Sequence, residues 1–229
     1  RALQTVPAPT APEPLIAFAV AWVRAGDAKR AAALVQALPP RTPPAYGAVA
    51  AVLRGERLTD ATLLARLGER PGCQDVGASQ QLHLLGRHGL AAAAAAAIRT
   101  ANPSCGAAWA AELHARGDLP PSAASHALAK AALAALPQSE AVLEATASVA
   151  RRHGDTAATI DRYERLARLA PKRAGSLGHL TNALMHEGAD RPALLAAYEA
   201  KFAADPSDDV NRFVLGVLLH YDDQYARSN

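Results

Sequence analysis

Apolar stretches of helical length alternate with short polar breaks along almost the whole chain. Each recurring unit has an apolar segment, a glycine often followed by an acidic residue, a second segment rich in Ala and Leu, and a proline. The turn glycines are Gly26, Gly55, Gly89, Gly117, Gly154 and Gly188, and Asp222 takes the next place. The closing prolines are Pro39, Pro71, Pro103, Pro137, Pro171 and Pro206. Glycine readily adopts the left-handed conformation that ends a helix, and proline stops the next one. The pattern therefore predicts antiparallel helix hairpins of about 34 residues.

The composition favours helix over sheet. The chain has 58 Ala and 29 Leu, against 15 Val and Ile together, and Ala and Leu lose little on entering a helix. We expect an all-α fold of about six hairpins plus the first helix of a seventh, preceded by a Pro-rich linker at residues 1–12. The expected helical domain covers residues 13–229, with repeats at about 13–40, 42–71, 74–103, 104–137, 140–173, 174–208 and, in part, 209–229.

Acidic residues follow several of the turn glycines. Asp27, Asp118, Asp155 and Asp190 stand where a side chain caps the next helix by accepting hydrogen bonds from its first backbone N–H groups. One hairpin cannot bury its apolar stripe alone. We therefore expect neighbouring hairpins to stack around a continuous core.

The clearest unit, residues 140–173, resembles the tetratricopeptide repeat family. The family-like residues are Leu143 at its fourth place, Gly154 at the fifteenth, Asp155 at the sixteenth, Tyr163 at the twenty-fourth and Pro171 at the thirty-second. Thr159 stands where the family usually has Ala. The resemblance implies a right-handed superhelical solenoid of about six and a half repeats. It also implies a non-catalytic scaffold that binds proteins or peptides on the concave face formed by the first helices, within a longer bacterial-type chain or assembly.

The resemblance also places a peptide-binding groove. Its inward-facing residues are Arg151, Arg152, Lys172, Arg173, Asn182 and His186. Four cations and an Asn suit a carboxylate or an acidic peptide, because Arg can hold a carboxylate through two parallel hydrogen bonds. Glu144 replaces the Lys of the family's carboxylate clamp, so that specific clamp is absent and only a general basic groove is expected. The alternative is that these basic residues form a solvated face near the helix ends.

The two cysteines occupy equivalent places in consecutive repeats. Cys73 and Cys105 each lie two residues after a repeat-ending proline, 32 residues apart. Adjacent first helices in such a stack lie side by side, so a disulfide is geometrically conceivable. The alternative is two thiols that merely share a repeat position. A disulfide would imply an oxidising compartment, and a periplasmic or otherwise extracytoplasmic location is weakly favoured over a cytoplasmic one.

Catalytic and cofactor-binding patterns are missing from the sequence. Five histidines are expected near the ends of first helices, where a cation complements the helix dipole: His88, His114, His153, His186 and His220. His179 and His186 are two turns apart but lack a third ligand at a convincing spacing. The sequence shows no nucleophile elbow and no glycine-rich phosphate loop. It therefore predicts that the protein is not an enzyme and has neither a metal site nor a cofactor.

The charge balance and the hydropathy limit the classes of partner. The net charge is +3, which is too balanced to predict nucleic-acid binding. No uncharged apolar stretch reaches about 18 residues, so direct membrane insertion is not expected. Two other functions stay open, namely a recruiting or regulatory domain of a larger enzyme and an extracytoplasmic assembly or polysaccharide-export factor.

The last expected helix, residues 207–221, is apolar nearly all round. Phe213, Val214, Val217 and Leu218 are predicted to form an exposed C-terminal edge. Repeat arrays need a polar cap at each end. We therefore expect this edge to pack on further repeats or on another chain.

Overall fold

The computed structural model describes residues 11–68, 71–117, 122–171, 175–185 and 189–228, with side chains as far as Tyr221. Within these ranges the chain forms thirteen α-helices, one short 3-10 turn and no strand, which confirms the all-α prediction. The elements are α1 (Pro12–Arg24), α2 (Ala28–Gln36), α3 (Pro44–Leu53), α4 (Asp60–Leu67), η2 (Cys73–Asp75), α5 (Val76–Leu84), α6 (His88–Ala101), α7 (Gly106–Gly117), α8 (Ala123–Ala135), α9 (Glu140–Arg152), α10 (Thr156–Leu169), α11 (Ser176–Leu184), α12 (Arg191–Ala204) and α13 (Asp209–Ser228). The expected linker lies outside the described residues as far as residue 10.

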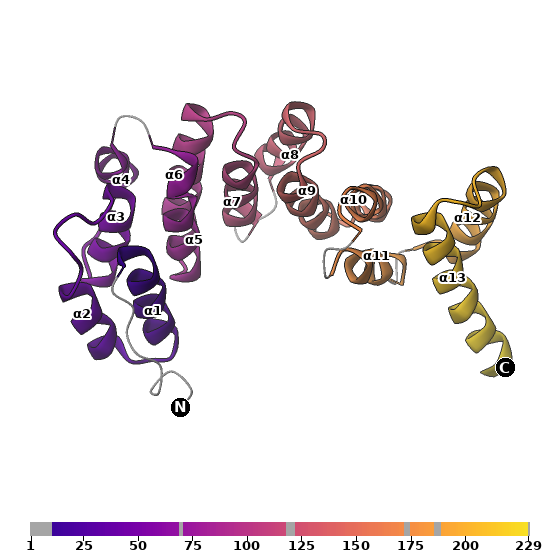
Figure 1. Cartoon of the computed structure of the whole chain (residues 1–229), viewed down its shortest axis with the longest axis horizontal. Coiled ribbons are helices and arrows are strands. Elements are labelled where there is room, and N and C mark those ends of the chain that lie inside the picture. Colours follow the sequence, from indigo (N-terminus) through magenta and orange to yellow (C-terminus); the bar gives the residue numbers. More distant parts are fainter. Residues whose placement is uncertain (1–10, 69–70, 118–121, 172–174, 186–188, 229) are drawn as a thin grey trace. The chain divides into compact units, whose positions relative to one another are not determined.

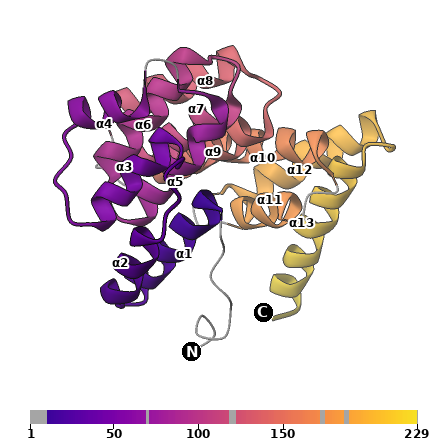
Figure 2. The same ribbon diagram turned by 60° about the vertical axis from the view of Figure 1, so that its left-hand side comes forward.

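The helices belong to two compact units, Arg1–Ser125 and His126–Asn229, and the boundary falls within α8. In the N-terminal unit, α1 packs on α2, α3 on α4 and α5 on α6 (Figures 1 and 2). In the C-terminal unit, α10 packs against both α9 and α11, and α12 packs on α13. None of the helices in the described ranges has a segment of the length and apolarity needed to span a bilayer.

Local turn chemistry forms several of the hairpins as predicted. Gly26, Gly55 and Gly154 have φ values of 85°, 87° and 72°, in the left-handed region that suits glycine. Asp27, Asp155 and Asp190 cap α2, α10 and α12 by accepting hydrogen bonds from the backbone N–H groups of Arg30 (3.0 Å), Ala158 (2.9 Å) and Ala193 (3.2 Å). These cap predictions are confirmed. Asp118 and Gly188 lie outside the described residues.

The turn between α5 and α6 is at Gly86, and the prediction of Gly89 is wrong. Gly86 has a φ of 71° and directly follows Leu85, the residue that caps the end of α5. Its N–H donates to the carbonyl of His83 at 2.9 Å, and the next N–H donates to Leu82 at 2.9 Å, which closes the helix end. Gly89 instead lies in the first turn of α6. His88 is therefore the first residue of a second helix and not the end of a first helix.

Small side chains fill much of the core of the N-terminal unit. Alanines of α1, α3, α5 and α6 are fully buried beside a few larger residues, and the central members are Ile16, Ala19, Val20, Ala48, Val49, Leu63, Ala78, Leu82, Ala91 and Ala94. Helices with alanine faces can approach closely, and such contacts tolerate little added volume.

Replacing Gly77 with Ala should destabilise the N-terminal unit by about 1–3 kcal/mol. A Cβ atom at Gly77 in α5 would lie 2.3 Å from the Oη atom of Tyr46 in α3. Tyr46 is only 4% exposed and has little room to move. Chemical denaturation of Gly77→Ala alone and with Tyr46→Phe measures the effect. Removing the hydroxyl should recover most of the loss, and a double variant as unstable as Gly77→Ala would contradict the contact.

The last helix is longer than predicted. α13 runs from Asp209 to Ser228 without a break at Asp222, where the repeat pattern predicts the next turn. His220 therefore lies within a helix and not near its end. Aspartate does not stop a helix as glycine or proline does, because it can keep a right-handed backbone and its N–H group.

Two of the four residues predicted to form an exposed C-terminal edge are buried. Val214 is fully buried and Leu218 is 4% exposed, and both belong to the core of the C-terminal unit with Leu180 and Tyr198. Phe213 and Val217 are half-buried. The prediction is wrong for Val214 and Leu218 because α10, α11 and α12 all contact α13 and cover one of its faces.

Candidate functional site

A pocket in the C-terminal unit forms where α9, α10 and α11 meet. The hairpin turn at Gly154 brings the last turn of α9 next to the start of α10, and α11 packs against α10. On α10, residues 156, 159 and 163 follow the three- and four-residue spacing that places side chains on one helix face. On α11, residues 179, 182 and 183 follow the same rule. One face from each helix therefore lines the pocket.

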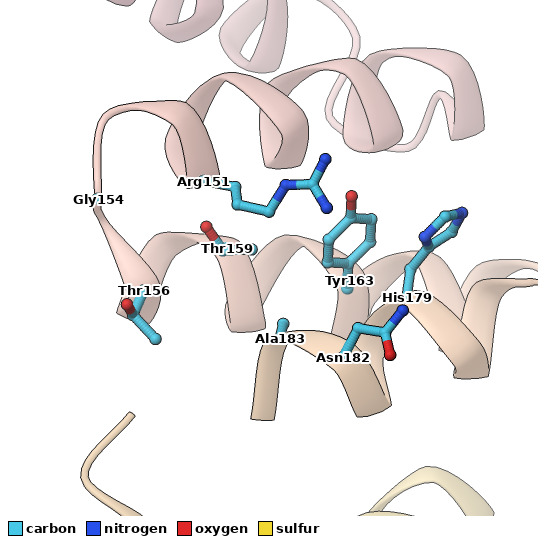
Figure 3. A pocket seen from close by; sticks show the side chains of 8 residues that line it. All are labelled: Arg151, Gly154, Thr156, Thr159, Tyr163, His179, Asn182 and Ala183. Atoms are coloured by element: carbon cyan, nitrogen blue, oxygen red, sulfur yellow. The ribbon is translucent and has the colours of Figure 1, made fainter. Parts of the chain in front are cut away.

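The pocket has a volume of about 230 Å³. The residues that line it are Arg151, Gly154, Thr156, Thr159, Tyr163, His179, Asn182 and Ala183 (Figure 3). Its floor is buried, since Thr159 and Tyr163 are 2% and 3% exposed. Arg151, His179 and Asn182 are exposed. The pocket thus combines a buried floor with an exposed opening that carries the guanidinium of Arg151.

An aromatic pair forms one wall of the pocket. The rings of Tyr163 and His179 are stacked, with centroids 5.3 Å apart and planes inclined by 17°. In Figure 3 the guanidinium group of Arg151 extends toward the hydroxyl end of Tyr163, and Asn182 lies on the α11 side. Burial raises the pKa of Tyr163, and the positive charge of Arg151 opposes that rise. The phenol therefore stays protonated at neutral pH and can donate a hydrogen bond.

One hydrogen bond to the backbone orients a pocket residue, and another joins α10 to α9. The Thr159 hydroxyl donates to the carbonyl of Asp155 at 2.7 Å. Arg162 extends from α10 to α9, where its NH1 group donates to the carbonyl of Thr146 at 2.6 Å. Burial lowers the pKa of Arg162, but a guanidinium does not lose its proton in proteins, so Arg162 stays charged. The walls are thus positioned before any ligand binds.

The pocket contains two of the six predicted groove residues. Arg151 and Asn182, which come from different helices, both line it. Arg152 is exposed at the end of α9, where its NH1 group lies 3.5 Å from the Ser148 hydroxyl. Lys172, Arg173 and His186 lie outside the described residues. The wider basic groove therefore stays a prediction.

The sequence reasoning missed the aromatic part of the site. The sequence identifies Tyr163 only as a repeat position, and His179 only as a histidine without the partners of a metal site. The spacing of these two residues within the repeat could have indicated the contact, because a bulky residue on the second helix of one repeat faces the first helix of the following repeat. The stacking itself depends on how α10 and α11 pack.

A network of ion pairs links α10 to α12 and α13. Glu164 accepts hydrogen bonds from the Tyr198 hydroxyl at 2.8 Å and from the Lys201 ammonium at 3.0 Å, and it pairs with Arg168 at 2.6 Å. Arg168 also contacts Asp208 at 3.1 Å. Burial alone would raise the pKa of Glu164, but these three donors outweigh it and lower that pKa. Arg168 also donates to the Asn211 side chain of α13 at 2.8 Å, so the network joins three helices of the C-terminal unit.

A disulfide and an ion cluster lie close together along the chain in the N-terminal unit. Cys73 and Cys105 are joined by a disulfide with their Cα atoms 5.8 Å apart. Asn102 donates to the carbonyl of Pro71 at 2.8 Å and so ties the same two segments together. Glu112 of α7 is 1% exposed and pairs with Arg99 at 2.7 Å and Arg116 at 2.8 Å. The disulfide and the ion pairs together fix α7 to the segment before α5 and to α6.

No protein-family model matches the chain, and no curated protein matches it. The residues of the hairpins and of the pocket therefore carry the functional argument. In the described part of the chain, no group of three or more His, Cys, Asp or Glu side chains could hold a metal ion. The pocket residues can supply a guanidinium, an amide, a phenol and an imidazole, which together suit binding of a carboxylate.

Proposed function

We propose that this chain is a non-catalytic protein-interaction module and that the pocket formed by α9, α10 and α11 binds a carboxylate-bearing segment of a protein partner. The observation that carries this proposal is that Arg151 and Asn182, from separate helices, line one pocket with the stacked Tyr163–His179 pair. A guanidinium and a side-chain amide both donate hydrogen bonds to carboxylate oxygens. An aromatic wall adds an apolar surface for the adjoining part of the peptide.

The proposed architecture is a right-handed solenoid of tetratricopeptide-like hairpins. In the α9–α10 hairpin, Gly154 takes the left-handed turn, Asp155 caps α10, and Leu143 and Tyr163 are buried. These are the roles that the repeat requires at those places. The thirteen helices in the described ranges equal the number in six hairpins plus one further helix. Both observations support the proposal.

The size of the pocket favours a peptide segment over a free cofactor. Pockets for drug-sized ligands have volumes of roughly 300–1,000 Å³, and this pocket is smaller at about 230 Å³. A single acidic residue or a chain terminus fits such a space. The remaining affinity must then come from contacts along a longer surface, as in other peptide-binding proteins.

Charge reversal at Arg151 should weaken peptide binding by at least about tenfold, because a charge-assisted hydrogen bond contributes about 1.5–3 kcal/mol. The probe is a set of peptides ending in Asp or Glu, prepared as free acids and as amides and screened against the whole chain by fluorescence anisotropy. Arg151→Glu and Asn182→Ala should each lower the affinity of the best free acid, and Arg151→Glu should also reduce its salt dependence.

Arg212→Glu provides a matched control for this experiment. Arg212 carries the same charge in the same unit but lies on α13, where it is 64% exposed and pairs with Asp209. This variant should bind the peptide as the unaltered protein does. Unchanged binding by Arg151→Glu and Asn182→Ala, with circular dichroism spectra that show intact helices, would exclude the pocket as the site.

A second candidate, an assembly factor outside the cytoplasm, is favoured by the disulfide. Structural disulfides persist in oxidising compartments and are rare in the cytosol. The Cys73–Cys105 bridge joins segments 32 residues apart. It stabilises the fold only in a compartment where the two cysteines become and stay oxidised. Alkylation of cell extracts before and after reduction measures the oxidised fraction. A protein found fully reduced in its native cells would remove this candidate and leave the peptide-binding proposal intact.

A further inference from the structure

A second cavity in the C-terminal unit, the α8–α9 groove, lies where the turn between α8 and α9 meets the last turns of α10. It has a volume of about 420 Å³, and the residues that line it are Pro137, Gln138, Leu143, Arg165, Arg168 and Leu169. Positions 165 and 168 lie about 120–180° around α10 from the pocket positions 156, 159 and 163, because 3.6 residues complete one helical turn. The groove is therefore separate from the pocket formed by α9, α10 and α11.

Most of the residues that line the α8–α9 groove are exposed. Pro137, Gln138, Arg168 and Leu169 are exposed, Arg165 is half-buried, and Leu143 is buried. Pockets for small molecules enclose about 70–90% of the ligand surface, and a groove with such an exposed lining does not. A segment of a larger ligand needs to insert only one or two side chains, so the groove suits a peptide segment of a protein partner.

Arg165 provides the groove with hydrogen-bond donors for an acidic group. Its NH2 group donates to the carbonyl of Pro137 at 2.8 Å, which holds the guanidinium at the groove. Its ion pair with Asp161 is long at 3.8 Å, and the Asp161 side chain is 64% exposed. Because a guanidinium has five N–H groups, further donors of Arg165 remain for a ligand. The amide of Gln138, which is exposed in the same lining, adds another donor.

Arg168 shapes the groove but is already bonded within the protein. Its guanidinium contacts Asp208 at 3.1 Å, Glu164 at 2.6 Å and Asn211 at 2.8 Å. The charges of Glu164 and Asp208 are balanced in the same contacts, so neither carboxylate opposes a ligand at Arg165 as strongly as an unpaired one. Asp161 is then the carboxylate that competes with a ligand for Arg165.

We propose that the α8–α9 groove binds a segment of a protein partner in which an acidic residue adjoins an aliphatic residue. The ligand carboxylate accepts hydrogen bonds from Arg165 and replaces the long contact with Asp161. The aliphatic side chain covers Leu169, which is 41% exposed, and removes apolar surface from water. Since this groove and the pocket lie on different sides of α10, the C-terminal unit can hold two segments at once and join two partners.

Peptides blocked at both ends test the groove without presenting a chain terminus. A library of such peptides with a central Glu-Leu pair and varied flanks is screened against the full-length chain by fluorescence anisotropy. The tightest binder should lose at least about fivefold in affinity when the pair becomes Gln-Leu or Glu-Ser. Arg165→Gln and Leu169→Gln should each weaken binding to a similar extent. Asp161→Asn should strengthen it about two- to fivefold, because the competing carboxylate is removed.

Arg212→Gln is the matched control, because Arg212 is an exposed arginine of the same unit on α13, and it should leave the affinity unchanged. NMR of the unaltered protein locates the peptide without any variant, and the shifts should concentrate in residues 137–143 and 165–169. The proposal is wrong if no peptide of the library binds, or if Arg165→Gln and Leu169→Gln bind as tightly as the unaltered protein. Shifts confined to residues 151–163 and 179–183 would also overturn it, and would support the pocket of the proposed function instead.

Discussion

Removal of the disulfide should lower the free energy of unfolding of the N-terminal unit by about 3–4 kcal/mol. The bridge closes a loop of 32 residues, and the loss of chain entropy that such a loop imposes on the unfolded state predicts this magnitude. The double variant Cys73→Ala with Cys105→Ala removes the bond without adding a polar group at Cys105, which is 5% exposed in an apolar cluster. The stability should fall by a large fraction, because small domains are stable by only about 5–15 kcal/mol.

Tryptophan fluorescence during chemical denaturation measures this loss in the N-terminal unit alone. The chain has two tryptophans, Trp22 and Trp109, and both belong to that unit. Reduction of the unaltered protein should produce the same shift as the double variant, since Cys73 is exposed to the reagent. The reductant should have no effect on the double variant. Identical unfolding curves for the oxidised and reduced unaltered protein would contradict a stabilising role.

Replacing Glu164 with Gln should destabilise the C-terminal unit by about 2–3 kcal/mol. The substitution keeps the shape of the side chain but removes the charge that Tyr198, Arg168 and Lys201 contact. Loss of one partner from a fully buried ion pair costs about 3–5 kcal/mol. We expect a smaller loss for Glu164→Gln because its partners are not fully buried. The Arg168 and Lys201 side chains are 37% and 43% exposed and regain contact with water.

The same carboxylate should make the C-terminal unit sensitive to acid. The pKa of Glu164 is lowered from 4.5 in the folded protein, so the folded state binds this proton less readily than the unfolded state. The contribution is therefore complete above about pH 4.5 and is lost as the pH falls through the lower, folded pKa. Glu164→Gln should remove this part of the pH dependence.

Hydrogen exchange of peptides from α10, α12 and α13 measures both effects within the C-terminal unit. Protection in the unaltered protein should decrease between neutral pH and pH 3, after correction for the intrinsic rate, and Glu164→Gln should show a smaller change. Glu199→Gln provides a control with the same substitution in the same unit, because Glu199 is exposed on α12. Equal protection of the Glu164→Gln variant and the unaltered protein at neutral pH would show that the network does not stabilise the unit.

The repeat pattern predicted some residues of the candidate binding site and missed others. The repeat register predicted that Arg151 and Asn182 face the same groove, and the pocket contains both. The register could not predict the Tyr163–His179 stack, because it depends on the rotation and separation of α10 and α11. It also could not separate Glu112 and Glu164 from the surface charges. Their burial depends on arginines and a lysine brought from other turns and helices.

Local chemistry in the sequence determined the helical class, the turns at Gly26, Gly55 and Gly154, and the caps Asp27, Asp155 and Asp190. These features depend on residues within about four places of one another, where backbone conformation and hydrogen bonding act directly. The turn at Gly86 is local in the same way, because its N–H and the next one donate back to the carbonyls of His83 and Leu82. Tertiary packing determined the closeness of Cys73 to Cys105 and the burial of Val214 and Leu218. Each of these outcomes depends on side chains distant in sequence, whose contacts exist only after the helices have packed.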